Sequence, residues 1–441
     1  MAQTGSISRR TLLGAGVGAA AVPVLAACGG ETTSGTGEEG EVTFLSTQFE
    51  PVEERQRFEQ VLADRGGEVA VAFNPVDAGV FATQVTSQVD ADRVQVSLLG
   101  GLHGDLAPHA DRLVDLDELA AGLADRGIPP DLTELGRLGG GTVKYIPWMQ
   151  ASYVFAVHRQ ALEWLPSGVD PEQLTYDGLL DWMIAARQGN DGTPVFGFPA
   201  GPEGLYHRFF QGYLLPSFTG GQITTFRSPE AVQAWEFMRE LWANTADAST
   251  NYDFMQEPLQ RGEVLVGFDH VARLVDAPAQ DPDQWLMVPA PRGPQGLGYM
   301  LVVAGLAIPR GAPEPDGAEA LIEALAVPET QVEVLRRNAF FPVVAADLPG
   351  DLPPAVALEA AAVRAQQEAP DALVSLPPVG LGEQDGEVSQ IFKNCFIEIC
   401  LDGNPIPQVL DDQGSQLDAI MAELDVPCWL PDTAADSCRV S

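Results

Sequence analysis

Lysine is almost absent from this 441-residue sequence, which contains only Lys144 and Lys393. Arginine supplies nearly all of the 24 basic residues, and these face 62 acidic residues, so the formal net charge is −38 at pH 7. Such an excess of negative charge is repelled by nucleic acids and by anionic lipid surfaces. DNA and RNA are therefore excluded as partners. The acidity itself is equally consistent with a saline habitat, where salt screens self-repulsion, and with a codon bias toward arginine.

The short motifs that carry common catalytic chemistry are also missing. The sequence has no G-x-S-x-G, no H-E-x-x-H, no phosphate loop and no G-x-G-x-x-G on a predicted strand-to-helix turn. The glycine run at residues 139–141 lacks the lysine that a phosphate loop requires. We therefore expect neither enzymatic activity nor a cofactor. Because carboxylates are so numerous, a pair spaced for glycoside hydrolysis can arise by chance, and a secreted hydrolase stands as an alternative.

Only one long apolar run occurs, at residues 12–27, directly after Arg9 and Arg10. It is shorter than the roughly 20 apolar residues that span a bilayer. A basic start, a short apolar middle and a small-residue exit predict a signal peptide at residues 1–27, and the paired arginines indicate the twin-arginine type. The exit sequence, LAAC, resembles the bacterial lipobox. We expect Cys28 to be lipidated and to anchor the mature protein at the outer face of the cell membrane, through a flexible tether at residues 28–40.

The other four cysteines, Cys395, Cys400, Cys428 and Cys438, all lie near the C-terminus. Residues 386–401 show the spacing of a helix, on which positions five apart point about 140° away from each other, so Cys395 and Cys400 are not expected to pair together. Either Cys428 and Cys438 close a small loop of their own, or the helix cysteines reach the tail. Four cysteines allow three full pairings, and the spacing does not choose among them.

Short apolar strands alternate with amphipathic helices after the tether. The predicted strands are residues 42–46, 69–73 and 94–99, and the predicted helices are residues 53–65 and 80–89. This β-α-β-α-β order predicts a parallel α/β sheet. The body that begins at residue 41 is too long for one core and favours two lobes.

Several segments of this body resemble the family 1 extracellular solute-binding proteins, the carbohydrate-type receptors of ATP-binding-cassette (ABC) importers. They are residues 141–148 (GTVKYIPW), 153–159 (YVFAVHR), 175–180 (TYDGLL), 259–264 (LQRGEV), 266–268 (VGF), 289–294 (PAPRGP) and 305–309 (GLAIP). The resemblance implies an α/β fold of the periplasmic-binding-protein type, with two lobes that close on a ligand. We place lobe 1 at residues 41–147 and 303–345 and lobe 2 at residues 148–302 and 346–441, with crossings near 147, 302 and 345.

Polar and aromatic residues near strand ends and crossings are the candidate ligand contacts. Aromatic faces stack on sugar rings, amides and carboxylates bind hydroxyl groups, and the loops after the strands of an open sheet supply such groups. The candidates are Gln48, Glu50, His103, Trp148, Gln150, Tyr206, Asp269 and Tyr299. Trp148 suits a core position equally well, and the solvated surface is favoured for Glu50 and His103.

The sequence departs from the family pattern at three places that bear on the ligand. Residues 100–102 contain no acidic residue, Asp269 stands where an aromatic residue is common, and residues 302–304 (VVA) replace a glycine pair and an aromatic. We expect a receptor for a small solute, most simply a sugar, that works with the permease subunits of an importer and contacts the membrane only through its lipid. A polyol, a cation or a metal is the alternative ligand.

A metal ligand set is the most specific of these alternatives. His103, Asp105 and His109 are spaced closely enough to form a cluster. The simpler interpretation is that Asp105 caps a helix that carries His109 on its surface.

Overall fold

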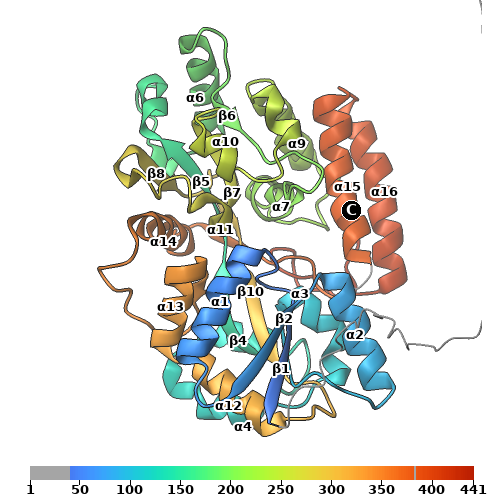
Figure 1. Ribbon diagram of the computed structural model, residues 1–441. Helices are drawn as coiled ribbons and strands as arrows, with labels where there is room; N and C mark the ends of the chain where they lie inside the picture. The colour runs from blue at the N-terminus through green and yellow to red at the C-terminus, as the bar shows by residue number, and fades with distance from the viewer. Residues whose placement is uncertain (1–39, 382–383) are drawn as a thin grey trace, which may run out of the picture. The chain divides into compact units, whose positions relative to one another are not determined.

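The computed structural model describes residues 40–381 and 384–441, all within one compact unit that begins at residue 37. Its strands form a six-stranded sheet in the order β11-β4-β10-β3-β1-β2, a four-stranded sheet in the order β6-β7-β5-β8, and a two-stranded sheet that pairs β12 with β9 (Figure 1). The predicted signal peptide, Cys28 and nearly all of the tether lie outside the described residues. No helix of the described part has the length and apolar character that a bilayer crossing requires.

The six-stranded sheet begins with the predicted parallel β-α-β-α-β unit. Its strands are β1 (Glu41–Ser46), β2 (Ala70–Pro75), β3 (Leu98–Leu102), β4 (Ile146–Ala151), β10 (Val302–Ala307) and β11 (Phe341–Pro342). β1 runs parallel to β2 and β3, whereas β10 runs antiparallel between β3 and β4. The third strand starts four residues later than predicted, because β1 pairs with it only from Leu98 onward.

Helices of two sequence regions accompany this sheet. They are α1 (Val52–Arg65), α2 (Ala78–Asp90), α3 (His103–Leu106), α4 (Asp117–Gly122), α5 (Pro130–Leu135), α12 (Pro315–Leu325) and α13 (Pro328–Asn338). The Asp77 carboxylate accepts the N–H of Val80 at 2.9 Å and so caps the start of α2. α1 buries Phe58, Val61 and Leu62, as its apolar spacing predicts.

The four-stranded sheet consists of β5 (Tyr153–His158), β6 (Phe196–Gly197), β7 (Val266–His270) and β8 (Trp285–Val288). The remaining helices are α6 (Tyr176–Gly189), α7 (His207–Phe209), α8 (Leu215–Thr219), α9 (Pro229–Trp242), α10 (Gln256–Gln260), α11 (Val271–Leu274), α14 (Pro354–Gln367), α15 (Asp385–Phe396) and α16 (Ile406–Leu424). Thr175 and Ser228 cap α6 and α9 through their hydroxyls, at 3.0 and 3.1 Å. Phe155, Phe209 and Phe268 form part of the aromatic core against this sheet.

The chain enters or leaves the six-stranded sheet over very short distances, toward the four-stranded sheet after β4 and from the two-stranded sheet before β10. β4 and β5 are separated only by Ser152, and β9 (Leu297–Met300) and β10 only by Leu301. Residues 148–151, which the sequence placed in the second lobe, continue β4 of the six-stranded sheet, since Met149 and Ala151 pair with β10.

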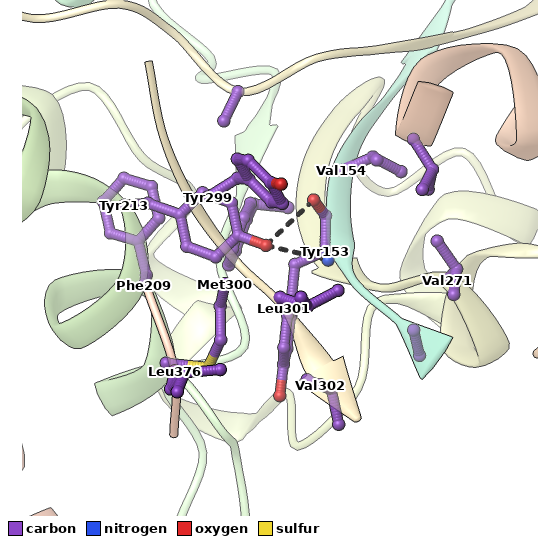
Figure 2. Close-up of a cluster of buried hydrophobic side chains, with 14 of the residues drawn as sticks. Tyr153, Val154, Phe209, Tyr213, Val271, Tyr299, Met300, Leu301, Val302 and Leu376 are labelled. Carbon is purple, nitrogen blue, oxygen red and sulfur yellow. Dashed lines mark hydrogen bonds between the residues drawn. The ribbon is translucent and has the colours of Figure 1, made fainter. Parts of the chain in front are cut away.

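Tyr213 connects these two chain segments through hydrogen bonds. The Tyr213 hydroxyl accepts the N–H of Tyr153 at 2.8 Å and lies 3.1 Å from the Ser152 hydroxyl, and Ser152 in turn donates to the carbonyl of Met300 at 2.9 Å. Figure 2 shows the Tyr213 hydroxyl pointing at the main chain of Tyr153, beside Met300 and Leu301. β12 (Ala372–Ser375) pairs with β9 next to this cluster.

The C-terminal segment is closed by a disulfide. Cys428 and Cys438 are bonded at 2.05 Å, whereas Cys395, which is buried in α15, and Cys400, which is partly buried, are free thiols. Between the bonded cysteines, the buried Asp432 carboxylate accepts main-chain N–H groups of residues 222–224. This carboxylate holds the disulfide loop against the loop that precedes α9.

Candidate functional site

A cavity with a volume of about 880 Å³ lies between α2, α3 and the segment that leads into α15. Its lining residues are Ala78, Gly79, Ala82, Thr83, Thr86, Ser87, Leu102, Gly104, Asp105, Pro108, His109, Arg112, Arg208, Pro377, Pro378, Leu381, Asp385 and Gly386. It therefore joins elements of the six-stranded sheet to Arg208 of α7, which belongs to the other sheet's helices. No tryptophan, tyrosine or phenylalanine is among the described lining residues.

One wall of the cavity is a smooth face of α2. Residues four positions apart lie above one another on a helix. The lining residues of α2 therefore form two adjacent rows, one at positions 78, 82 and 86 and the other at positions 79, 83 and 87. All six side chains are small, and Thr83, Thr86 and Ser87 add hydroxyl groups. This wall offers apolar contact with a few hydrogen-bonding groups.

Asp105 is the acidic residue that the six-stranded sheet contributes. Its Oδ2 accepts a 2.7 Å hydrogen bond from the Thr47 hydroxyl and a 2.9 Å bond from the N–H of Leu102, at the start of α3. Asp105 thus caps α3, as the sequence suggested. Burial raises the pKa of Asp105, with Asp385 adding to the shift and the two hydrogen bonds and Arg208 opposing it. Both hydrogen bonds from the described residues end on Oδ2, so Oδ1 is the oxygen left for a ligand.

Arg208 and Asp385 supply opposite charges on the other side. The Arg208 guanidinium donates to Gln211 Oε1 at 3.1 Å, and its Nη2 lies 3.9 Å from Oδ2 of Asp385. The Arg208 side chain is 16% exposed, so it is held near the cavity rather than extended into solvent. A wall with two carboxylates, Asp105 and Asp385, and two guanidinium groups, Arg112 and Arg208, can accept hydrogen bonds from hydroxyl groups and donate to ring or hydroxyl oxygens.

His109 lies in the cavity wall, not on the helix surface that the sequence suggested. It is 4% exposed, and within residues 40–381 and 384–441 neither ring nitrogen has a hydrogen-bond partner. Burial lowers the pKa of His109, and the nearby Arg112 lowers it further, against the opposing effect of Asp111 and Asp90. Arg112 itself is fixed by two bonds to Asp90, at 2.9 and 3.0 Å. The described residues contain no group of three or more His, Cys, Asp or Glu side chains that could hold a metal.

None of the eight side chains nominated from the sequence lines this cavity. The Gln48 amide donates to the Thr47 hydroxyl at 3.1 Å, next to Asp105. His103 lies between two lining residues, but it is buried rather than solvated, and its Nδ1 is 2.8 Å from the Tyr145 hydroxyl. Burial lowers the pKa of His103 to about 4. Glu50 is exposed.

Three of the remaining candidates are buried in the core or make hydrogen bonds within the protein. Trp148 is 1% exposed and packs against Phe58, with ring centroids 5.6 Å apart. Gln150 donates to the carbonyl of Pro342 at 2.9 Å, and Tyr299 is buried in the cluster of Figure 2.

Asp269 and Tyr206 are also buried. The Asp269 carboxylate turns back to accept the N–H groups of Met255 and His270, at 2.8 and 2.7 Å. Burial raises the pKa of Asp269 to about 7 against these hydrogen bonds. Tyr206 stands under Lys393, whose Nζ lies 5.2 Å from the ring centroid and donates to the carbonyl of Pro202 at 3.2 Å.

Arg208 and Asp385, which line the cavity, were missed for two different reasons. Arg208 lies two residues after the nominated Tyr206, and a lone arginine among aromatic residues was the available signal. Asp385 sits among many other acidic residues, and nothing in the sequence distinguishes it.

The chain belongs to the bacterial extracellular solute-binding protein family, whose sequence profile matches residues 52–332. No curated protein sequence matches it. Among solved structures, it is similar to maltose-bound MalE3 of T. maritima, with 19% identity over 86% of this chain and 99% of the other and a TM-score of 0.66. The GacH receptor of Streptomyces glaucescens shows 15% identity over 88% and 100% of the chains, with a TM-score of 0.69.

A third similar structure is the solute-binding protein of Agrobacterium vitis with bound D-mannitol. It shares 17% identity over 87% of this chain and 98% of the other, with a TM-score of 0.65. At such identities the likeness establishes the fold, which is the two-lobe periplasmic-binding-protein architecture with a sheet in each lobe. The family is one of binding proteins, and its description places its members outside the cytoplasm.

Proposed function

We propose that this protein is the receptor of an ABC importer and binds a hydroxyl-rich small solute, a sugar or a polyol, in the 880 Å³ cavity. The observation that carries this proposal is the composition of the cavity wall. Asp105 comes from the first lobe and Arg208 from the second, and Asp385 stands beside Arg208. A ligand that contacts both lobes favours the closed arrangement, because it binds that arrangement more tightly.

The wall suits the chemistry of such a ligand. Carboxylate oxygens accept hydrogen bonds from hydroxyl groups, the guanidinium donates to ligand oxygens, and the small side chains of α2 face the apolar side of a ring. A volume of about 880 Å³ falls near the upper end of the roughly 300–1,000 Å³ found for small-molecule pockets. The cavity is therefore large enough for more than one sugar ring.

The similar structures support this ligand class. These proteins were solved in complex with maltose, acarbose and D-mannitol, all of which are rich in hydroxyl groups. Because no aromatic residue is among the described lining, we propose that the small face of α2 and the pair Pro377 and Pro378 take the place of a stacking platform. Gln48 and His103, next to Thr47 and Gly104, are proposed as further contacts once the lobes close.

We also propose that the protein is exported as a lipoprotein. Arg9 and Arg10 before the apolar run support twin-arginine export, and the LAAC sequence that ends at Cys28 supports lipidation. The permease subunits of the importer are the proposed protein partners, and the lipid is the proposed membrane contact.

A ligand panel tests the proposal directly. Thermal unfolding is measured with maltose, acarbose, galactose, mannitol and a set of cationic and acidic solutes, since a bound ligand raises apparent stability by RT ln(1 + [L]/Kd). We expect a saturable increase with at least one neutral hydroxyl-rich solute and a loss of that increase in Asp105→Ala. Stabilisation by charged solutes alone, or turnover of a sugar into products, contradicts the proposal.

A further inference from the structure

A second cavity, of about 160 Å³, is lined by residues of α1 and α13 of the first lobe, of α11 and the segment after it, and of the start of α14. Its lining residues are Arg57, Ala272, Val275, Asp276, Ala279, Arg336, Arg337, Asn338, Ala339, Pro353, Pro354, Ala355 and Val356. Three arginines and one carboxylate thus surround a small space, in a chain whose acidic residues outnumber its basic residues by 62 to 24. The side chains that line this space carry more positive than negative charge, although Asp351, Asp64 and Glu333 outside the lining pair with two of the arginines.

One of these arginines has no protein partner in the described part of the chain. Arg336 is paired with Asp351 at 3.0 Å, and Arg337 with Asp64 at 2.9 Å. Arg57 makes no hydrogen bond and no ion pair with the described residues, and its Nε is buried without an acceptor. A buried donor without a partner is costly, and charged donors are the most costly of all. The Nε of Arg57 is therefore a donor for which the described residues supply no acceptor, although the Glu54 carboxylate lies near the guanidinium.

The start of α14 adds main-chain donors to the same space. Pro353 and Pro354 carry no N–H, and no side chain caps this 14-residue helix. The first N–H groups that the helix offers belong to Ala355 and Val356, which are buried and line the cavity. Uncapped N–H groups at the positive end of a helix dipole bind anions.

The cavity wall also contains hydrogen-bond acceptors, and these restrict which anions can bind. Asn338 is 3% exposed, and its Nδ2 donates to the carbonyl of Glu54 at 2.9 Å, while its Oδ1 is buried without a donor. The Asp276 carboxylate lines the cavity as well. Chloride and sulfate have no proton to donate to these oxygens, whereas hydrogen phosphate has both acceptor oxygens and a P–O–H donor.

We propose that this cavity is a binding site for inorganic hydrogen phosphate. Arg57 and the N–H groups of Ala355 and Val356 hold the acceptor oxygens, and Asn338 Oδ1 or Asp276 accepts the phosphate proton. Because α1 and α13 belong to one lobe while α11 and α14 pack against strands of the other, the anion contacts both lobes. Phosphate occupancy and lobe closure are therefore coupled, and the coupling acts equally in both directions.

Anion titration tests the site without knowledge of the transported solute. Thermal unfolding and isothermal titration calorimetry of the purified protein are carried out with phosphate, sulfate and chloride at pH 7 and matched ionic strength. We expect saturable binding and stabilisation by phosphate, with at least tenfold weaker effects of sulfate and chloride. If the three anions have equal effects, they bind only through general electrostatic attraction, and the proposal is overturned.

Substitutions locate the site. Arg57→Gln is expected to weaken phosphate binding at least tenfold. Arg55→Gln is the matched control, because Arg55 lies on the same helix, is 44% exposed and pairs with Glu59, and it is expected to change the affinity less than twofold. Asp276→Asn leaves Arg57 intact. In this variant the ratio of phosphate affinity to sulfate affinity is expected to fall at least fivefold. Equal losses in the two arginine variants, or an unchanged preference in Asp276→Asn, contradict the assignment.

Discussion

The Thr47 hydroxyl donates a 2.7 Å hydrogen bond to Oδ2 of Asp105. The loop after the first strand thereby fixes the carboxylate that follows the third strand, although the two residues are 58 positions apart. Since parallel strands end at the same edge of a sheet, these two loops meet, and the orientation of Asp105 in the cavity depends on Thr47.

The first prediction removes this hydrogen bond. Thr47→Val keeps the shape of the side chain but leaves Asp105 free to turn, and we expect ligand affinity to fall by about 1 kcal/mol, roughly fivefold. Calorimetric titration with a solute identified in the panel measures the effect. Thr142→Val is the control, because Thr142 makes an equal 2.7 Å bond to the exposed Asp115, which does not line the cavity. Similar losses in both variants contradict a positioning role for Thr47.

The second prediction concerns the charge from the other lobe. Arg208→Gln removes a guanidinium that lines the cavity, and we expect at least a tenfold loss of ligand affinity, because hydrogen bonds to charged groups contribute about 1.5–3 kcal/mol. Titration of the variant is compared with Arg239→Gln, which alters an exposed arginine on α9. Unchanged affinity in Arg208→Gln places the ligand elsewhere.

The third prediction separates core from site. Trp148 is fully enclosed against Phe58, so Trp148→Ala is expected to lower the free energy of unfolding by about 3–5 kcal/mol. Urea denaturation measures this loss, and Trp148→Phe is expected to retain most of the stability. A stable Trp148→Ala protein that fails to bind ligand shows instead that Trp148 is a ligand contact.

The fourth prediction follows from the raised pKa of Asp269. Its carboxyl has a folded-state pKa of about 7 because of burial, against about 3.9 in an unfolded chain. The folded state therefore holds this proton more tightly, and the stabilisation present below pH 4 is lost as pH rises toward 7. We expect the free energy of unfolding of the wild type to fall, relative to that of Asp269→Asn, by a few kcal/mol over this range. If the free energies of unfolding of the two proteins change in the same way with pH, the prediction for Asp269 is wrong.

The fifth prediction tests the anchor. Cys28→Ala is expected to release the mature protein from the membrane fraction, because the lipidated thiol is lost while the body of the protein is unchanged. Fractionation and mass spectrometry of the mature N-terminus provide the measurement. An unmodified N-terminus at another residue shows that the LAAC sequence is not used.

Much of the fold follows from local patterns in the sequence. The alternation of apolar strands and amphipathic helices predicted the parallel unit of β1, β2 and β3, because periodicity depends only on which face is buried. The caps at Thr175 and Ser228 are equally local features, since capping involves residues three positions apart. The start of β3 was less readable, because it depends on where its partner strand begins to pair.

The cavity was harder to predict, because it depends on the direction of each side chain rather than on its place in a strand or loop. Asp269 follows a strand as a ligand contact would, but its carboxylate turns back to two N–H groups. His109 carries a polar ring that favours the surface, yet α2 covers it. Arg208 and Asp385 meet only because α7 and α15 pack together, 177 positions apart in the sequence.

The position of Lys393 has a consequence for the chemical labelling of this protein. Only two lysines exist in the sequence, and Nζ of Lys144 is held by Asp115 at 2.6 Å. Burial lowers the pKa of Lys393, which increases the unprotonated, nucleophilic fraction of its amine at mildly alkaline pH. An acylating fluorophore is directed to a position above Tyr206, two residues from the cavity-lining Arg208. The natural protein thus carries its own attachment point for an optical reporter of solute binding, with no cysteine to be introduced.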